Sequence, residues 1–496
     1  DMPEGTALPA TTNMARELAE KLREIPEVTA LQTYAGTARP FDFNGMVRHY
    51  YLRTDPWLAE IQVQLTHKSK RSRSSHEVAE EARALLTPIA QTDGAKVTVA
   101  EMPPGPPVVQ AVVAEIYGPD AATRRQVASD MTAMFEATDG LADVDNYMSQ
   151  PYEAWRFVID TQKASTKGVS PSTVIETLST AMGDYKITDV REGSALEPTW
   201  IVIEAPLALR ANPKALSDLP IPAPGGSTLP LAELGSFERI QEDPIIYHKD
   251  LRPLEYVVGD AVGRLGAPIY PMAKIDEKLA DYVTPDGQTI SGTMMGKPED
   301  NGLSAFEWAG EWTVTYETFR DMGAAFAVAL VLIYMLVVGM FGNFLVPAII
   351  MAPIPLTLLG IVPGHWLVSL LSGSNAYFTA TSMIGFIALA GIIVRNSILL
   401  VDFAVEETRK GIDVREAVIR SCKARTRPIM ITAFALIGGA SVILTDPIFQ
   451  GMAISLMFGV FVSTVLTLLV IPLGCVSASD SLREIAAARD GEAAKT

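Results

Sequence analysis

Five long stretches of apolar residues lie in the last third of the chain. The first, residues 322–341, contains no charged side chain. A helix needs about 20 apolar residues to cross roughly 30 Å of hydrocarbon, so this stretch predicts a membrane-spanning helix. The four others are residues 344–371, 377–405, 428–445 and 448–476. The pattern therefore predicts an all-α transmembrane bundle of five helices.

The charges between these stretches predict the orientation of the bundle. Seven basic residues lie between the third and fourth stretches, whereas the breaks around Ser372 and Asp446 carry no Lys or Arg. By the positive-inside rule the basic loop is cytoplasmic. Because five is an odd number, we expect residues 1–320 on the outer side and the C-terminus in the cytoplasm.

Residues 1–320 show the pattern of repeated α/β units, with amphipathic helices lying on a sheet. An S-x-x-E capping signature at Ser74 and Glu77 marks one helix start, and Ser170 before Pro171 marks another. The positions with helical spacing are Met14, Leu18, Leu22 and Ile25; Val78, Ala82, Leu85 and Ile89; and Val127, Met131 and Met134. The strand-like runs are residues 61–65, 108–117, 156–160 and 200–204.

Two proline-rich segments interrupt this pattern. Residues 103–107 (PPGPP) can form neither a helix nor a strand, because proline is unfavourable in both, and they predict a subdomain boundary. Residues 220–230 (PIPAPGGSTLP) predict a loop, consistent with an excursion that leaves one subdomain and returns.

The composition of the chain argues against several classes of function. The net charge is −17, and all of it belongs to residues 1–320, because residues 321–496 carry 11 basic and 11 acidic side chains. An acidic chain does not fit a nucleic-acid partner. The two cysteines, Cys422 and Cys475, leave the acidic region without a disulfide framework, and the five histidines show no metal-ligand spacing. No phosphate-binding loop motif occurs either. We therefore expect no metal site and no cofactor.

The start of the chain does not show how residues 1–320 would be translocated to the outer side of the membrane. An outer domain of this size needs a signal or a preceding span, yet the sequence begins at Asp1, within what reads as a strand-turn-helix unit. We expect a fragment or processed half of a larger membrane protein, with at least one span before it.

Two segments carry a resemblance to a known family. Residues 385–404 (GFIALAGIIVRNSILLVDFA), followed by a basic loop that ends in RTRPIMIT at Thr432, resemble the signature of resistance-nodulation-division (RND) efflux transporters of the acriflavin-resistance, hydrophobe–amphiphile type. Residues 158–184 and the FEWAG segment at 306–310 are similar to other parts of the family. The family has twelve spans in two pseudo-repeated halves, and this chain looks like the second half from just after the seventh helix.

The resemblance implies α/β periplasmic porter and docking subdomains of ferredoxin-like βαβ units, followed by the five-helix bundle. The outer part would divide into porter subdomains, which a docking subdomain interrupts, and a lead-in to the membrane. The implied ranges are 1–105 and 106–153 (porter), 154–240 (docking), 241–305 (porter), 306–321 (amphipathic lead-in), 322–479 (helices) and 480–496 (cytoplasmic tail).

Arg395 is the first candidate for chemistry. It lies about ten residues, or ~15 Å of helix, from the cytoplasmic end of the third stretch, where a charge costs ~2.5–3.5 kcal/mol unless it faces a partner. It is either an arginine that snorkels to the interface or a functional charge. The resemblance implies the second, because the position matches a basic residue, usually lysine, that pairs with proton-relay carboxylates of the half not present here. Asn396 adjoins it, and Thr432 on the next stretch matches a polar family position of the same relay, although each could simply bond within the bundle.

A second set of candidates lies in the outer domain. Phe41, Phe43 and Gly45 lie in a string (FDFNG) that resembles the family's switch loop between two drug pockets, and Tyr34 lies near another pocket aromatic. Aromatic side chains on a loop bind varied apolar drugs through contact area and stacking. Without the resemblance, two phenylalanines beside a glycine would be assigned to a core.

The sequence thus predicts half of a proton-driven inner-membrane efflux permease for hydrophobic or amphiphilic compounds, not an enzyme. Its implied partners are the missing half, two further copies in a trimer, a periplasmic adaptor, an outer-membrane channel and membrane lipid. Two alternatives remain open. One is a metal-ion exporter of the same superfamily, for which Met294–Met295 is the only adjacent methionine pair. The other is a membrane-anchored sensor, which would not need Arg395.

Overall fold

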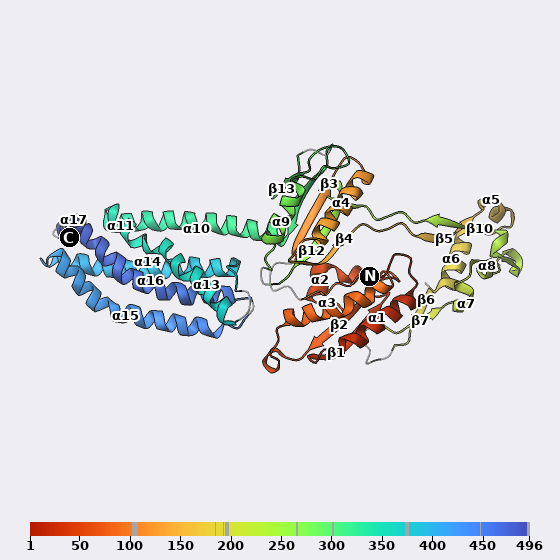
Figure 1. Cartoon of the computed structure of the whole chain (residues 1–496), viewed down its shortest axis with the longest axis horizontal. Helices are drawn as coiled ribbons and strands as arrows, with labels where there is room; N and C mark the ends of the chain where they lie inside the picture. Colours follow the sequence, from red (N-terminus) through yellow and green to blue (C-terminus); the bar gives the residue numbers. More distant parts are fainter. Residues whose placement is uncertain are drawn as a thin grey trace. The chain divides into compact units, whose positions relative to one another are not determined.

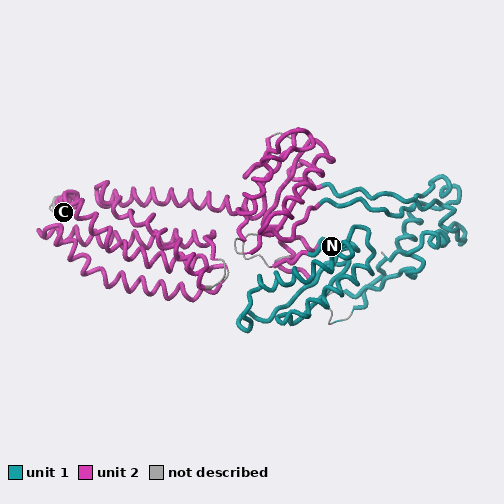
Figure 2. Tube along the Cα trace, in the orientation of Figure 1, with its two compact units in different colours: residues 1–39, 52–97, 148–246 teal, residues 40–51, 98–147, 247–496 magenta. Residues whose placement is uncertain are grey.

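The computed structural model describes residues 1–101, 108–183, 185–191, 193, 198–263, 266–299, 302–372, 376–446 and 448–493. The proline-rich string at 103–107 lies outside these residues, so the subdomain boundary placed there stays a prediction. The chain forms two compact units, and each collects separate segments of the sequence (Figure 2). Unit 1 comprises residues 1–39, 52–97 and 148–246, and unit 2 comprises residues 40–51, 98–147 and 247–496.

The first part of unit 1 packs two helices, α1 (Leu8–Leu22) and α3 (Ser75–Thr92), beside the antiparallel pair β1 (Val28–Ala35) and β2 (Ala59–Leu65). Of the apolar positions predicted from helical spacing, Leu18 and Val78 are among those that are buried, whereas Leu85 and Ile89 of α3 are half-buried. The predicted capping box at the start of α3 is present.

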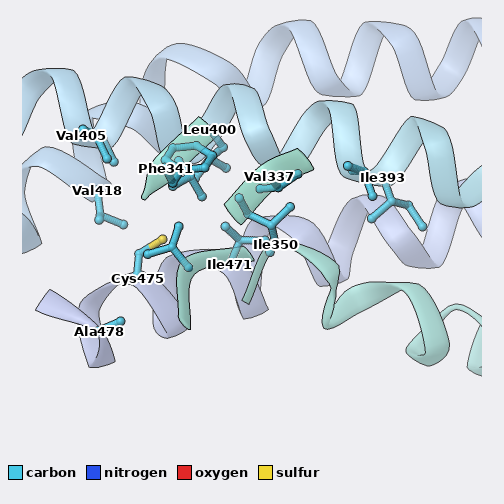
Figure 3. Close-up of a cluster of buried hydrophobic side chains, with 14 of the residues drawn as sticks. Val337, Phe341, Ile350, Ile393, Leu400, Val405, Val418, Ile471, Cys475 and Ala478 are labelled. Carbon is cyan, nitrogen blue, oxygen red and sulfur yellow. The ribbon is translucent and has the colours of Figure 1, made fainter. Parts of the chain in front are cut away.

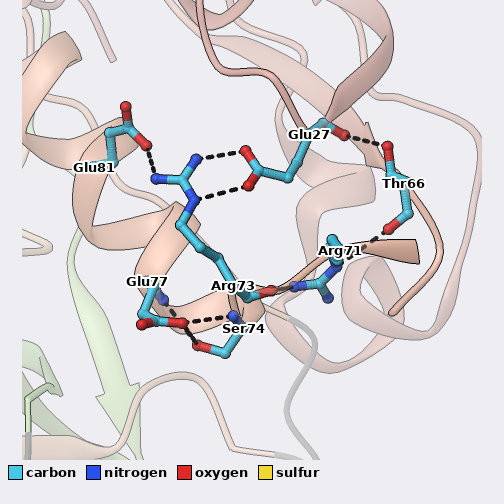
Figure 4. Close-up of polar contacts among 7 residues, drawn as sticks. All are labelled: Glu27, Thr66, Arg71, Arg73, Ser74, Glu77 and Glu81. Carbon is cyan, nitrogen blue, oxygen red and sulfur yellow. Dashed lines mark hydrogen bonds and ion pairs between the residues drawn. The ribbon is translucent and has the colours of Figure 1, made fainter. Parts of the chain in front are cut away.

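Residues 68–73 (KSKRSR), just before α3, form a basic run in which Arg73 makes ion pairs. Arg73 donates from Nε to Glu27 Oε1 at 2.8 Å and also pairs with Glu81, so it ties the start of α3 to the loop before β1 (Figure 4). The hydrogen bond from Arg73 is the largest cause of a lowered pKa of the Glu27 carboxyl, and the positive charge of Arg73 lowers this pKa further.

The second part of unit 1 corresponds to the predicted docking region. Strands β5 (Glu153–Ile159) and β10 (Gly235–Gln241) pair antiparallel, and α6 (Pro171–Met182) starts at the predicted Ser170 cap. Residues 220–230, predicted as a loop, instead form a short hairpin of β8 (Pro220–Pro222) and β9 (Thr228–Pro230). A two-stranded pair has only edge strands, which tolerate proline, and the buried side chain of Ile221 holds the hairpin to the core. The remaining elements of unit 1 are α5 (Thr161–Thr166), β6 (Tyr185–Asp189), β7 (Trp200–Ile203), α7 (Leu207–Arg210), α8 (Pro213–Leu216), η2 (Lys68–Lys70), η3 (Pro224–Gly226) and η4 (Leu231–Glu233).

Unit 2 contains a six-stranded sheet whose centre is β3 (Val112–Tyr117), which is buried along its whole length. Two helices, α4 (Ala121–Glu136) and α9 (Ile269–Leu279), belong to this part of the unit. The strands around β3 are β12 (Arg252–Ala261), β14 (Ala305–Gly310), β4 (Leu141–Asn146), β11 (Tyr247–Lys249) and β13 (Ser291–Thr293). In the sheet β4 pairs with β12, β12 with β3, and β3 with β14, all antiparallel.

The sheet passes directly into the first membrane helix. Residues 306–310, predicted as part of an amphipathic lead-in, form β14, and α10 (Glu311–Phe341) begins at the next residue. Gly310 joins them with φ 79° and ψ −140°, and a Cβ there would lie 2.7 Å from the carbonyl oxygen of Gln110. Only glycine fits this joint.

Among the described residues, four helical segments are long and apolar enough to cross a membrane: Glu311–Phe341, Leu345–Leu371, Ala380–Arg409 and Gln450–Ser477. The second is broken into α11 (Leu345–Met351), α12 (Pro353–Leu356) and α13 (Leu358–Ser372), and the last two are α14 (Ala380–Arg409) and α16 (Gln450–Ser477). The remaining predicted span is the fourth stretch, residues 428–445, which falls largely in the second half of α15 (Val414–Val442; Figure 1). The uncharged part of this helix, residues 428–442, provides only ~22 Å of helix. This span, and the orientation that rests on an odd number of spans, stay predictions.

These helices share one core of buried apolar side chains. Val337 of α10, Ile350 of α11, Leu400 of α14 and Ile471 of α16 belong to it (Figure 3). The predicted tail is also structured, because residues Ser479–Ala493 form helix α17, which packs against α14.

Candidate functional site

Arg395 lies near the midpoint of α14, roughly 21 Å of helix from either end. Its side chain is exposed on the surface of this chain, and within the described part of the chain it makes no hydrogen bond or ion pair. Asp402, two turns farther along the same helix, is paired, because it accepts from Arg489 of α17 at 2.8 Å. The structure therefore leaves one unpaired cation at membrane depth in α14.

Asn396 and Thr432 come together, as sequence reasoning grouped them. Both line a small cavity of about 10 Å³ between α14, α15 and α16, which is near the lower limit of the space that one water molecule needs. Thr432 is half-buried and donates back to Pro428 O at 3.0 Å. Arg395 does not line this cavity, because it faces another side of the same helix.

Three further polar residues of α16 line the same cavity and were missed from the sequence. They are Ser463, Thr464 and Thr467, all buried. Ser463 and Thr464 donate to Val460 O at 3.0 and 2.7 Å. The sequence could have identified them, because three hydroxyl residues at positions i, i+1 and i+4 of an otherwise apolar helix lie close together on its surface. Hydroxyl groups and the amide of Asn396 therefore line this cavity, which lies at the same level of the bundle as Arg395.

The predicted switch loop in unit 2 is partly helical. Phe43 opens the short helix α2 (Phe43–Arg48), which Asp42 caps by accepting from Gly45 N at 2.7 Å. Phe41 is 67% exposed and Phe43 is 45% exposed, so neither is a core residue. The ring centroids of Phe41 and Tyr51 are 5.8 Å apart. Phe41 and Phe43 are therefore exposed aromatic side chains at the capped start of a short helix.

A buried ion pair anchors this segment at its other end. Arg48 Nη1 and Nη2 each lie 3.4 Å from Asp260 Oδ2 of β12, with side chains 9% and 15% exposed. Asp260 Oδ1 accepts from Ala111 N at 3.2 Å, and Ala111 O accepts from Glu311 N, the first residue of α10. Asp260 thus connects α2 with the joint between the sheet and the membrane helix. We name this group, Arg48, Asp260, Ala111 and Glu311, the Asp260 junction.

Tyr34, the fourth predicted pocket residue, belongs to unit 1. It lies on β1, half-buried, and its hydroxyl donates to Gln32 Oε1 at 3.0 Å. Its predicted place beside the switch loop stays a prediction.

The sheet of unit 2 also buries charges that the sequence did not single out. Glu115 of β3 accepts from Lys249 Nζ at 2.6 Å and from the Tyr117 hydroxyl at 3.0 Å. Glu307, opposite Glu115 on β14, lies 3.8 Å from the same ammonium, and burial raises the pKa of its carboxyl. Among the described residues no three His, Cys, Asp or Glu side chains are grouped so as to hold a metal ion.

Comparison with known proteins identifies the class to which this fold and bundle belong. The sequence profile of the AcrB/AcrD/AcrF family matches residues 1–476. The chain therefore belongs to the AcrB/AcrD/AcrF family, and the resemblance to RND transporters is confirmed.

The names of individual relatives indicate different roles. The chain is 24% identical to the swarming motility protein SwrC of Bacillus subtilis (strain 168), with 72% of this chain and 32% of that protein covered. It is 23% identical to the cobalt-zinc-cadmium resistance protein CzcA of Cupriavidus metallidurans, over 73% of this chain and 33% of the relative. It is 25% identical to the toluene efflux pump membrane transporter TtgB of Pseudomonas putida, over 58% and 25%.

The solved structures support the fold. A heavy metal efflux pump superposes with a TM-score of 0.65 at 21% identity, covering 95% of this chain and 46% of that one. The chain therefore spans about a third or less of the length of these relatives and about half of the solved structure.

Proposed function

We propose that the chain is the C-terminal half of an inner-membrane, proton-driven RND efflux permease that exports hydrophobic or amphiphilic compounds. The observation that carries the proposal is Arg395, a cation at mid-membrane depth of α14 with no ionic partner among the described residues. Such a charge is expensive unless another element pairs with it. Carboxylates of the other half would provide that pairing and would bind and release the proton.

The bundle and the outer domain would work together in this cycle. Protonation of the partner carboxylates would change their attraction to Arg395 and favour a different arrangement of α14 relative to its neighbours. Helix α10, joined to the sheet without a linker, would transmit that change to a periplasmic substrate cleft. The strand order β4-β12-β3-β14 in unit 2 supports a ferredoxin-like porter subdomain. The trimer, the periplasmic adaptor and the outer-membrane channel belong to the same proposal.

The exposed pair Phe41 and Phe43 favours apolar substrates, because open aromatic area binds such compounds with little directional demand. Metal-ion export is the second candidate, and the specific observation for it is the paired Met294–Met295, of which Met294 is 38% exposed. A sensor would have no use for an intramembrane cation.

The test is replacement of Arg395 by alanine in the complete permease. We expect export to fall about a hundredfold or more. The substitution removes the intramembrane counter-charge, whose interaction with the partner carboxylates is worth several kcal/mol. Arg395→Lys, which keeps the charge, is the matched variant and should retain export. Resistance to exported compounds and the amount of trimer in the membrane are measured together. Survival of resistance in the alanine variant would refute the coupling role.

A further inference from the structure

A groove between α15 and α16 lies apart from the cavity near Asn396. Its volume is about 490 Å³, and it is open to the surface. Six of its lining residues follow one face of α15, with the spacing i, i+3, i+4, i+7, i+8 and i+11. They are Arg415, Val418, Ile419, Cys422, Lys423 and Thr426, and Pro472, Leu473 and Val476 of α16 form the opposite wall.

The two cations of the groove differ from three of their neighbours in the basic loop. Arg409, Lys410 and Arg420 pair with Glu406, Glu407 and Glu416. Arg415 and Lys423 make no side-chain ion pair within the residues that the structure covers, and the groove lining contains no acidic residue. The groove therefore presents two exposed positive charges that have no ionic partner among the described residues.

The opposite wall is apolar and open. Its Leu473 is 69% exposed and its Val476 is 40% exposed, and Ile419 on the facing side of α15 is 41% exposed. Lys423 precedes the uncharged stretch of α15 that starts at Pro428 by five residues, or ~8 Å of helix. This is the depth of the lipid headgroup layer, which extends roughly 5–8 Å beyond the hydrocarbon.

We infer that the groove binds one anionic phospholipid, with its phosphate at Lys423, the Arg415 side chain extending toward it from farther out on α15, and an acyl chain that runs past Thr426 against Leu473. Charge complementarity selects this occupant, since basic pockets between membrane helices on the cytoplasmic side attract anionic headgroups. An apolar helix of another protein would leave both cations unneutralised. The inference rests on the proposed placement of the chain in the membrane, but not on transport.

Lipid retention tests the inference. The purified chain is reconstituted in nanodiscs of phosphatidylglycerol mixed with phosphatidylcholine, and the lipid that remains bound after transfer to detergent is counted by native mass spectrometry. We expect one retained phosphatidylglycerol, and about thirtyfold weaker retention in Arg415→Gln/Lys423→Gln, because each cation near the surface contributes about a five- to sixfold factor in affinity and the two factors multiply. The control Arg409→Gln/Lys410→Gln removes the same charge away from the groove and should retain the lipid. Equal retention of both lipids by the unaltered chain, or an equal loss in the control, would overturn the inference.

A second measurement locates the lipid. Cys422 lines the groove and is partly accessible, whereas Cys475 is buried. Maleimide labelling of Cys422 should slow at least fivefold in phosphatidylglycerol nanodiscs relative to phosphatidylcholine, in this chain and in the complete permease. If the other half of the permease blocks labelling whatever the lipid, protein rather than lipid fills the groove and the inference is wrong. Lipid binding by a permease that exports nothing would sustain this inference while refuting the proposed function.

Discussion

The guanidinium at position 395 limits what that residue can do in a proton-coupled cycle. Arginine does not release its proton in proteins, so Arg395 can act as a counter-charge but not as a proton carrier. The hydroxyl and amide groups of Thr432, Ser463 and Asn396 do not titrate near neutral pH either, although they can hold a water. Under the proposed mechanism the titrating groups must therefore come from the other half.

Asp276 provides a pH-dependent prediction at the same scale. Its Oδ1 accepts from the buried Trp308 Nε1 at 3.0 Å, and burial raises the pKa of the carboxyl above its ordinary value of 3.8. The folded chain then binds more protons than the unfolded one between the two pKa values, so the free energy of unfolding falls as pH rises through that window. Asp276→Asn keeps an acceptor and cannot ionise, so we expect it to gain stability over the unaltered chain between pH 4 and pH 7. Urea unfolding followed by tryptophan fluorescence measures the difference, and Asp281→Asn, at an exposed position of the same region, should show no such gain.

At the scale of elements, the Asp260 junction should control the switch segment. Removal of one partner of a buried ion pair costs of order 3 kcal/mol, because the other charge stays buried. Asp260→Asn should therefore raise amide hydrogen exchange in residues 40–51 and at the start of α10, and the charge-swapped Arg48→Asp/Asp260→Arg should restore part of the protection. Arg73→Gln, which breaks an ion pair of unit 1, is the control and should leave both segments unchanged. Protection that survives in Asp260→Asn would show that the junction does not hold α2.

The aromatic residues of the switch segment should set the substrate spectrum. Phe41→Ala or Phe43→Ala subtracts exposed contact area that bulky apolar compounds use more than small ones. We expect resistance to bulky substrates to fall about tenfold while resistance to small ones and the protein level stay unchanged. A uniform loss for all substrates, together with less protein, would assign these residues to folding instead.

The sequence predicted elements well where the pattern was local. The helices α1, α3 and α4 follow from apolar spacing, and the capping box at Ser74 gave the start of α3. Long-range contacts could not be predicted in this way. Arg48 and Asp260 are separated by 212 positions, and no periodicity links them. The strand at 306–310 was missed because its partner β3 lies far away in the sequence, while the adjacent helix dominates the local pattern.

For the whole molecule, the charge balance of the bundle predicts dependence on another chain segment. Asp402, the nearest carboxylate of α14, already pairs with Arg489, so it does not neutralise Arg395. Residues 1–496 in vesicles should show no transport driven by a pH gradient, and co-expression with the other half of the permease should restore it. The assay compares substrate accumulation with and without the gradient. Gradient-driven transport by residues 1–496 alone would overturn both the half-permease proposal and the pairing assigned to Arg395.

The joint at Gly310 gives the membrane helix a fixed rotational phase relative to the sheet. An α-helix turns by about 100° per residue, and no flexible residues separate β14 from α10 to absorb a rotation. The phase therefore determines which side chains of α10 face the other helices and which face lipid. One residue more or less at this joint would turn the whole helix by more than a quarter of a circle, whereas seven would bring it back to within about 20°. The length of this connection is thus constrained as tightly as the identity of the glycine within it.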